Sequence, residues 1–123
     1  MIAVDTSSLS RFFDGSQDRS IGVLRDALRA GIAVLPPIVL TELLSNDRLS
    51  LEAQIAIKDL PLLPLREAYW ERAGTLRASL LRAGHKAKLA DCLIAQSCID
   101  SAAPLITYDR DFRHFAAAGL RLL

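Results

Sequence analysis

The sequence has few cysteines, the residues whose disulfides stabilise secreted domains, and no apolar run long enough to span a membrane. Only two of its 123 residues are cysteine, Cys92 and Cys98, and their six-residue spacing fits neither a disulfide framework nor a zinc motif. We expect both to be small core residues in a reducing compartment. No apolar run approaches the roughly 20 residues of a membrane-spanning helix. The first residues also lack the cationic region of a signal peptide. A cytoplasmic protein without membrane contact is therefore predicted.

Charge of one sign is also scarce. The net charge is +1, so no global basic field attracts nucleic acid, and any such contact must be local. The one concentrated basic segment is 82–88, which is either an RNA-phosphate contact or a solvated loop. His85 and His114 lie in polar, loop-like contexts with no Ser or Cys nucleophile in a recognisable pattern. Glycine-rich phosphate-binding and dinucleotide-binding patterns are absent too. Common nucleophile–histidine and nucleotide-binding chemistries are thus disfavoured.

The composition and patterning predict one α/β domain over residues 1–123. The hydrophobic fraction is 51% and the charged fraction 24%, which is typical of a globular chain. Short apolar runs predict strands at 2–5, 33–35, 62–65, 105–107 and 120–122. Helices are predicted at 7–13, 19–30, after Pro36-Pro37, at 51–59, 67–83 and 88–101, with a helical turn at 111–115. This alternation favours a mostly parallel sheet covered on both faces.

Four carboxylates lie among apolar neighbours: Asp5, Glu42, Asp91 and Asp109. An acid in such surroundings is costly unless it is paired or bound to a cation. Asp5 and Asp109 each follow a strand-like run, so both belong at the carboxyl edge of the sheet, where ligands bind in this class of fold. Helical spacing places Glu42 and Asp91 on packed faces that can reach the same edge. One shared site is therefore expected.

Oxygen-only ligands suit Mg²⁺ or Mn²⁺, and sites of this kind commonly act on phosphates. Each acid also has a purely structural interpretation. Asp5 and Asp91 could cap helices, Asp109 could be a turn residue, and Glu42 could pair with an arginine. Four such coincidences in one small chain are less probable than one metal site.

Four segments resemble the PIN domain, most closely the VapC-like ribonuclease toxins of bacterial toxin–antitoxin pairs. Asp91-Cys92-Leu93-Ile94-Ala95 looks like the family's D-x-x-I-A run, and the segment 107–112 looks like its T-x-D-x-D-F run. The opening segment 2–7 and the segment 39–43 around Glu42 complete the resemblance. In this order, and in a chain of this length, the four segments together are specific.

The resemblance implies a PIN-like three-layer sandwich, with a central parallel sheet in the order 3-2-1-4-5 flanked by helices. It implies an endoribonuclease that uses Mg²⁺ or Mn²⁺ to activate water, with an RNA substrate, a cognate antitoxin protein and a homodimer. The metal-site and catalytic acids carry over onto Asp5, Glu42, Asp91 and Asp109. Thr107 and Ser7 match positions that hydrogen-bond within the site. Asp111 is expected to be an accessory acid that caps the turn carrying Phe112 and Phe115.

Two rival interpretations belong to other classes. A catalytically silent PIN-like scaffold would bind protein or RNA, and a missing acid would favour it, but all four are present. An aspartyl phosphatase would need D-x-D after the first strand, where the chain has Asp5-Thr6-Ser7. A phospho-receiver would need an acidic pair near the first strand and a late lysine, and the chain has neither.

Overall fold

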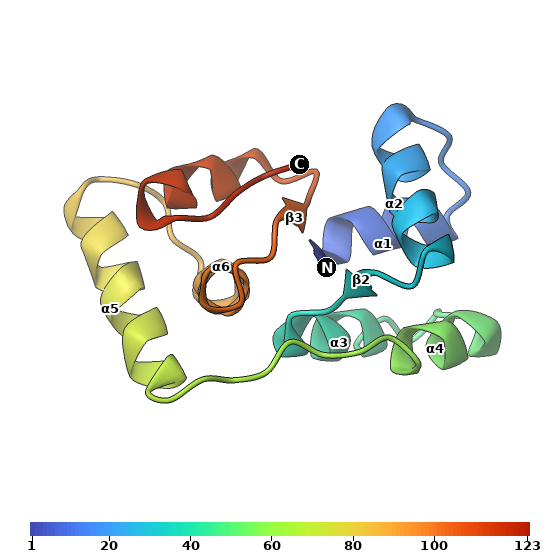
Figure 1. Ribbon diagram of the computed structural model, residues 1–123, viewed down its shortest axis with the longest axis horizontal. Coiled ribbons are helices and arrows are strands. Elements are labelled where there is room, and N and C mark those ends of the chain that lie inside the picture. The colour runs from blue at the N-terminus through green and yellow to red at the C-terminus, as the bar shows by residue number, and fades with distance from the viewer.

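A parallel sheet of three short strands lies at the centre of the computed structural model, which describes residues 1–123. The strands are β1 (Ile2–Val4), β2 (Ala33–Val34) and β3 (Leu105–Ile106). They lie in the order β2-β1-β3, with Ala3 opposite Val34 on one side and opposite Leu105 on the other. Because β1 is flanked on both sides, its last residues are fully buried. The predicted α/β class with a parallel sheet between helices is confirmed (Figure 1).

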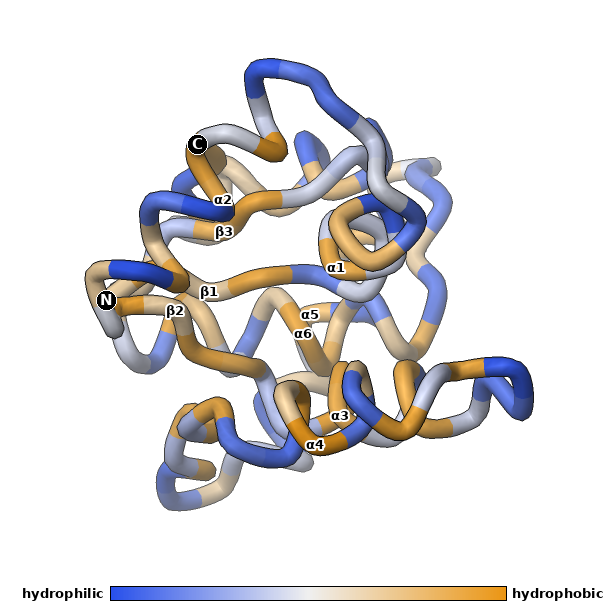
Figure 2. Tube along the Cα trace, turned by 90° about the vertical axis from the view of Figure 1, so that its right-hand side faces the viewer, coloured by the Kyte–Doolittle hydropathy of each residue, from blue (hydrophilic) through white to orange (hydrophobic).

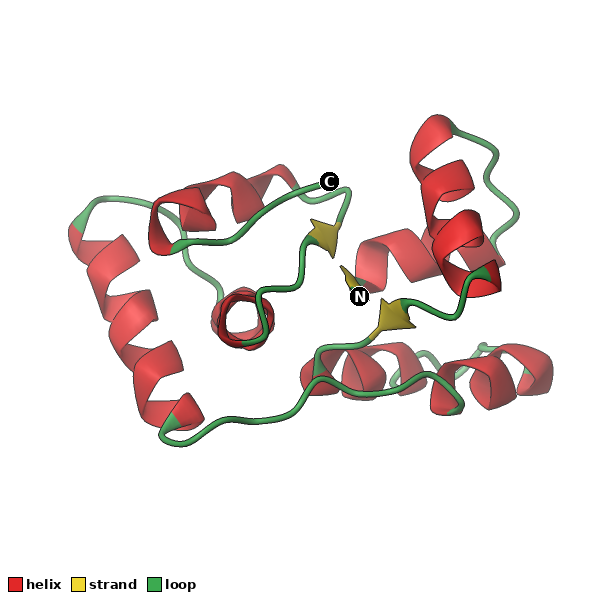
Figure 3. Cartoon of the chain, in the orientation of Figure 1, coloured by secondary structure: helices red, strands yellow, loops and turns green.

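Two of the five predicted strands do not form. The segments expected at 62–65 and 120–122 make one parallel bridge each, Leu62 with Leu35 and Leu122 with Leu105. The expected five-strand order is therefore reduced to three strands with a single bridge beyond each edge. Figure 3 draws both outer segments as loops. Pro61 and Pro64 explain the first shortfall, because proline has no N–H to donate and cannot extend a ladder.

Seven helical segments surround the sheet. They are α1 (Thr6–Phe13), α2 (Arg19–Arg29), α3 (Pro37–Leu44), α4 (Leu51–Lys58), α5 (Tyr69–Arg82), α6 (Leu89–Asp100) and the 3₁₀ helix η1 (Arg110–Ala118). Their ends lie within two residues of the predicted ends except in η1, which extends beyond the predicted turn. Every segment expected to be helical is therefore helical.

Local sequence explains α2 well. The Asp18 side chain caps its start by accepting from the Ile21 N–H at 3.0 Å. Ile21, Leu24 and Ala27 recur at every third position and are buried, so one stripe of the helix faces the core. Gly31 follows the helix with φ of +71°, a conformation that glycine adopts without strain. The amphipathic prediction for this segment is thus explained by capping, spacing and a glycine stop.

The helices form two outer layers. In Figure 1, α1 and α2 lie on one side of the strands, and α5, α6 and η1 lie on the other. The helix α3 contacts both α1 and α6 and so joins the layers. Figure 2 shows that the strands are apolar while hydrophilic stretches run through the outer loops. This arrangement leaves the ends of β1 and β3, where two of the acids lie, close to α1, α3 and α6.

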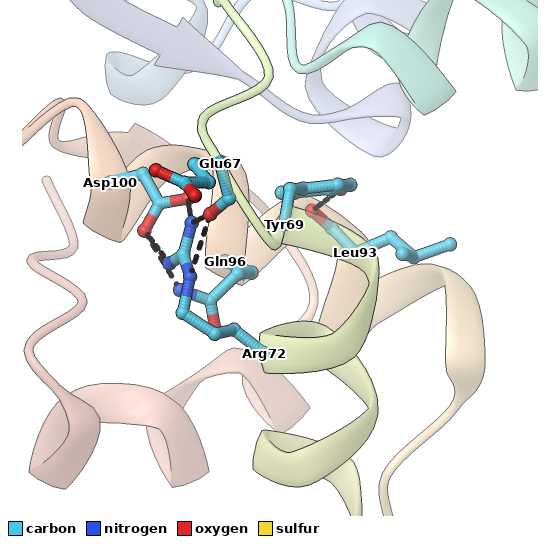
Figure 4. A network of polar contacts seen from close by, with 6 residues as sticks. All are labelled: Glu67, Tyr69, Arg72, Leu93, Gln96 and Asp100. Atoms are coloured by element: carbon cyan, nitrogen blue, oxygen red, sulfur yellow. Dashed lines mark hydrogen bonds and ion pairs between the residues drawn. The ribbon is translucent and has the colours of Figure 1, made fainter.

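The helices α5 and α6 are joined by a polar network (Figure 4). Arg72 forms the structure's one ion pair, with Asp100, whose carboxylate also accepts from Gln96 Nε2 at 2.9 Å. The Tyr69 hydroxyl donates to the Leu93 carbonyl. These contacts fix α6, and with it Asp91, against the outer layer.

The cysteines behave as predicted. Cys92 and Cys98 are free thiols and fully buried. Burial raises the pKa of the Cys98 thiol to about 12, so this group stays protonated and unreactive. No helix has the length and apolarity that crossing a membrane would require.

Candidate active site

Asp5 is the most firmly held of the four acids. It follows β1, is 5% exposed, and its N–H donates to the Ile106 carbonyl at 3.0 Å. Its Oδ1 accepts from the Thr6 N–H at 2.8 Å, so it caps α1. Its Oδ2 accepts from Thr107 Oγ1 at 2.7 Å and from Ser7 Oγ at 3.1 Å. A simple helix cap needs no partner from another strand, so the structure gives Asp5 more than its capping role.

The end of β3 supplies Thr107 and Asp109. Thr107 Oγ1 accepts from the Asp109 N–H at 3.0 Å, while the Tyr108 N–H donates to Ser7 Oγ at 3.1 Å. Because β1 and β3 are parallel neighbours, the bond between Tyr108 and Ser7 links the two strand ends directly. The hydrogen bonds expected for Thr107 and Ser7 are therefore present.

The prediction that Asp111 caps the following turn is wrong. Asp109 is the N-cap of η1, with an extended backbone, and its Oδ1 accepts from the Asp111 N–H at 2.9 Å. Asp111 already lies inside the first turn, where its own N–H needs a partner. Asp109 thus has both a capping role and a place beside the acid site.

Glu42 and Asp91 approach from the helices. Glu42 on α3 is half-buried, and its Oε1 accepts from Thr6 Oγ1 at 2.7 Å. The alternative of a Glu42–arginine pair is wrong, because the structure's one ion pair lies elsewhere. Asp91 lies in the first turn of α6 but does not cap it, since Lys88 is the N-cap residue. Two of the purely structural interpretations are thereby removed.

Asp91 connects the four acids electrostatically. Its pKa is raised from 3.8 to about 6, first by burial and then by the charges of Asp109 and Asp5, with a smaller contribution from Glu42. Lys88 acts in the opposite direction and offsets part of this effect. A carboxyl group perturbed by burial and by three like charges is typical of a functional site.

The donor set suits a hard divalent cation, although no group of three or more His, Cys, Asp or Glu side chains is positioned to hold a metal ion here. Asp5, Glu42 and Asp109 are instead turned toward hydroxyl and backbone donors. The chemistry of the acids fits Mg²⁺ or Mn²⁺, because all the ligands are oxygens and their charges repel one another. A closed coordination shell would require the carboxylates to draw together.

Two hollows flank the acids. One, of about 110 Å³, is lined by Thr6 and Glu42 between α1 and α3. The other, of about 170 Å³, is lined by Asp109 with the cations Arg110 and Arg113. A larger hollow, of about 280 Å³, is apolar, contains Trp70 and includes none of the four acids. The acid site is therefore open on its Glu42 and Asp109 sides.

Comparison with known proteins identifies the family. The family model of the PIN domain matches residues 2–118. The chain belongs to the PIN-domain family.

No curated protein matches this PIN domain. Among solved structures, it is similar to a chain of VapBC2 from Rickettsia felis, crystallised bound to a DNA fragment from the promoter of its genes. The TM-score is 0.75 at 22% identity, covering 100% of this chain and 98% of that chain, which shows a shared fold. The PIN-domain resemblance indicated by the motifs is thus confirmed.

The PIN domain also contains side-chain contacts that its sequence did not suggest. His85 lies in the loop before α6, as its polar context indicated, but His114 lies in η1, and the two rings stack with centroids 4.4 Å apart and planes at 22°. Arg11 of α1 lies over the ring of Tyr108. Both contacts join residues far apart in the chain, so no local pattern could have indicated them.

Proposed function

We propose that this PIN domain is a metal-dependent endoribonuclease and the toxin component of a toxin–antitoxin pair. The observation that carries the proposal is the position of Asp5, held at the end of β1 by Thr107 and close enough to Asp91 to raise its pKa. Carboxylates placed this close repel one another, and a bound cation that also binds a substrate phosphate would offset the repulsion. Family precedent supports the nuclease activity, and RNA is the substrate class we assign.

The four acids have distinct roles in this proposal. Asp5 and Asp91 hold the main Mg²⁺ or Mn²⁺, while Glu42 and Asp109 complete or orient its surroundings. When bound, the metal lowers the pKa of a water molecule and neutralises charge on the scissile phosphodiester. Thr107 and Ser7 fix the direction of the Asp5 carboxylate, and Thr6 does the same for Glu42. Such supporting hydrogen bonds set the orientation of ligands.

Expression in cells tests the activity. The wild type should stop growth and produce RNA fragments with new 5′-phosphate ends, whereas Asp5→Ala, which loses a metal ligand, should do neither at equal protein level. Asp26→Asn removes an exposed acid of α2 and serves as the control, which should behave as wild type. Equal growth arrest and equal fragment patterns with Asp5→Ala would reject the nuclease proposal.

A catalytically silent PIN-like scaffold is the alternative. It draws on one observation, that the acids are not gathered into a group able to hold a metal ion in this arrangement. The two functions differ in a simple property, since a scaffold needs no cation. Mn²⁺ titration by calorimetry separates them: binding that Asp91→Asn abolishes supports the nuclease, and no binding by the wild type supports the scaffold.

An antitoxin is the protein partner that we assign to this domain. The helix α4 exposes Leu51 and Ile55, which are 70% and 61% exposed, beyond what the core needs. The hollow beside Glu42 lies between α1 and α3. An apolar helix that covers α4 and directs a cation at the acids would match both features. Pull-down with the neighbouring gene product tests this, and Leu51→Glu should weaken capture.

We also assign a homodimer as the basic unit. Family precedent supports it, and so does the apolar hollow in which Trp70 is 63% exposed. Light scattering at tens of micromolar protein should give twice the monomer mass. A monomer throughout that range, together with failure to recover any partner, would contradict both assembly proposals.

A further inference from the structure

Arg11 is a cation held in a fixed position near the acid site. Its guanidinium carbon lies 4.1 Å from the centroid of the Tyr108 ring. The structure has one other such contact, Arg25 over Phe12, and it is looser at 6.0 Å. A guanidinium stacked on an aromatic ring loses little freedom when it binds a ligand through its free edge. Arg11 is therefore better organised for binding than an ordinary surface arginine.

Tyr108 links Arg11 to the acids. Its N–H donates to Ser7 Oγ, which in turn donates to the Asp5 carboxylate. Its hydroxyl donates to Asp18, the N-cap of α2. The ring under Arg11 is thus held at both ends, between the strand end and the start of α2.

The Arg11 guanidinium is free to take a ligand. It forms no ion pair, since the one in the structure joins Arg72 to Asp100. It also donates no hydrogen bond to the protein, although guanidinium has five N–H groups. The nearby Asp18 carboxylate is already bonded by the Tyr108 hydroxyl and the Ile21 N–H. Arg11 is therefore an exposed and oriented cation without an ion pair or hydrogen bond of its own. The Asp18 charge offsets part of its charge, and Tyr108 connects it to Ser7 at the acid site.

We propose that Arg11 binds a phosphate of the RNA backbone beside the acid site, with Tyr108 as the residue that positions it. This inference rests on the proposed function for the choice of RNA. A phosphodiester matches the planar fork of arginine, and phosphate also completes metal sites built from carboxylates. An acidic peptide would also match the Arg11 guanidinium, but it has no counterpart to the scissile phosphodiester that the proposed function places at the acids, whereas an RNA strand carries further phosphates on both sides of that bond. The observations therefore favour a nucleic-acid phosphate as the ligand.

Binding of a fluorescein-labelled, mixed-sequence 20-nucleotide RNA tests this by anisotropy in EDTA, where metal-dependent cleavage is blocked. Arg11→Met should weaken binding about five- to tenfold and reduce the slope of log affinity against log salt by about 0.7, as expected for one lost phosphate contact on a single strand. Arg11→Lys should recover part of the affinity, because it keeps the charge but not the stacked fork. Tyr108→Leu should resemble Arg11→Met, while Tyr108→Phe, which keeps the ring, should lose less.

Arg29→Met is the matched control. Arg29 is an exposed arginine at the end of α2, and the chain then enters β2, so it lies at the opposite edge of the sheet from Asp5. It should bind RNA as wild type does. Equal binding by Arg11→Met and Arg29→Met, or no binding of RNA by the wild type, would overturn the proposal. Arg11-dependent binding of polyglutamate as tight as that of RNA would also overturn it, in favour of an acidic protein partner.

Cleavage in Mn²⁺ by the wild type and by Asp5→Ala is measured separately. Failure of the proposed function would appear there, as no cleavage or as cleavage independent of Asp5. Failure of the Arg11 proposal appears only in the binding comparison and its salt slope. Melting temperatures of all variants identify any variant that does not fold. If Arg11→Met does not fold, the RNA affinity of Arg11→Lys relative to wild type decides the result.

Discussion

At the scale of single residues, burial and charge conflict most at Asp91. Its pKa is about 6 in the folded protein against 3.8 for the free group. Because the pKa is higher in the folded protein, ionisation of Asp91 lowers the free energy of unfolding. This destabilisation grows as the pH rises from about 4 to about 6. The shift corresponds to roughly 3 kcal/mol at most, and screening of this partly exposed group reduces it to about 1 kcal/mol.

Asp91→Asn should therefore raise the melting temperature of the metal-free protein at pH 7.5 by about 3 to 5 °C, and should leave it unchanged at pH 4. The same variant should lose Mn²⁺ binding in calorimetry. Asp26→Asn, an exposed acid on α2, should change neither quantity. A lower melting temperature at pH 7.5 for Asp91→Asn, or unchanged Mn²⁺ affinity, would show that Asp91 is a structural residue.

Asp109 and Asp111 differ in a way that a pair of substitutions can measure. Asparagine caps helices as well as aspartate does, so Asp109→Asn should keep the bond to the Asp111 N–H and the melting temperature. It should nevertheless lower the cleavage rate by at least about 100-fold, because a metal-site charge is lost. Asp109→Ala should lose a further ~1 kcal/mol of stability with the cap. Asp111→Asn should change little, and a larger loss of activity there than in Asp109→Asn would reverse the assignment.

At the scale of elements, the joined ends of β1 and β3 organise the site. Thr107 reaches from β3 to the buried Asp5 carboxylate, and its hydroxyl oxygen also accepts from the Asp109 N–H. One side chain thus orients two acids on neighbouring strands. Loss of the Thr107 hydroxyl would disturb the orientation of Asp5 and Asp109 while leaving their charges in place.

Thr107→Val keeps the shape of the side chain but removes its hydroxyl. It should destabilise the protein by about 1–3 kcal/mol, since a buried carboxylate loses a donor, and should slow cleavage about 10- to 100-fold through misoriented acids. Thr107→Ser retains the hydroxyl and should restore most of the rate. Equal rates for the valine and serine variants would mean that the Asp5–Thr107 bond has no part in the activity.

At the scale of the whole molecule, the sequence predicted what depends on local pattern. Apolar runs ending in Asp5 and Asp109 indicated parallel strands with acids at one edge, and the structure has them there. The outer strands were overpredicted, because apolar composition at 62–65 outweighed the prolines on either side of Leu62-Leu63. The fold class was predictable because the hydrophobic periodicity of a strand or a helix is visible within a short segment of sequence.

The details of the site were less predictable. The bond between Tyr108 and Asp18, and the stacking of His85 on His114, join residues brought together only by folding. Neither pair has a local spacing that marks it. The capping role of Asp109 was predictable from the sequence. An aspartate side chain commonly accepts a hydrogen bond from the backbone N–H two residues later, as Asp109 does from Asp111.

Cleavage of labelled RNA by the purified protein decides whether Asp5 belongs to a metal site that cleaves RNA. Wild type and the control Asp26→Asn should cut in Mn²⁺ to give 5′-phosphate products and should stop when EDTA is added. Asp5→Asn should be slower by at least about 100-fold, because the metal site loses a ligand charge. Cleavage that persists in EDTA, or that proceeds at the wild-type rate in Asp5→Asn, would mean that Asp5 holds no metal ion needed for the reaction.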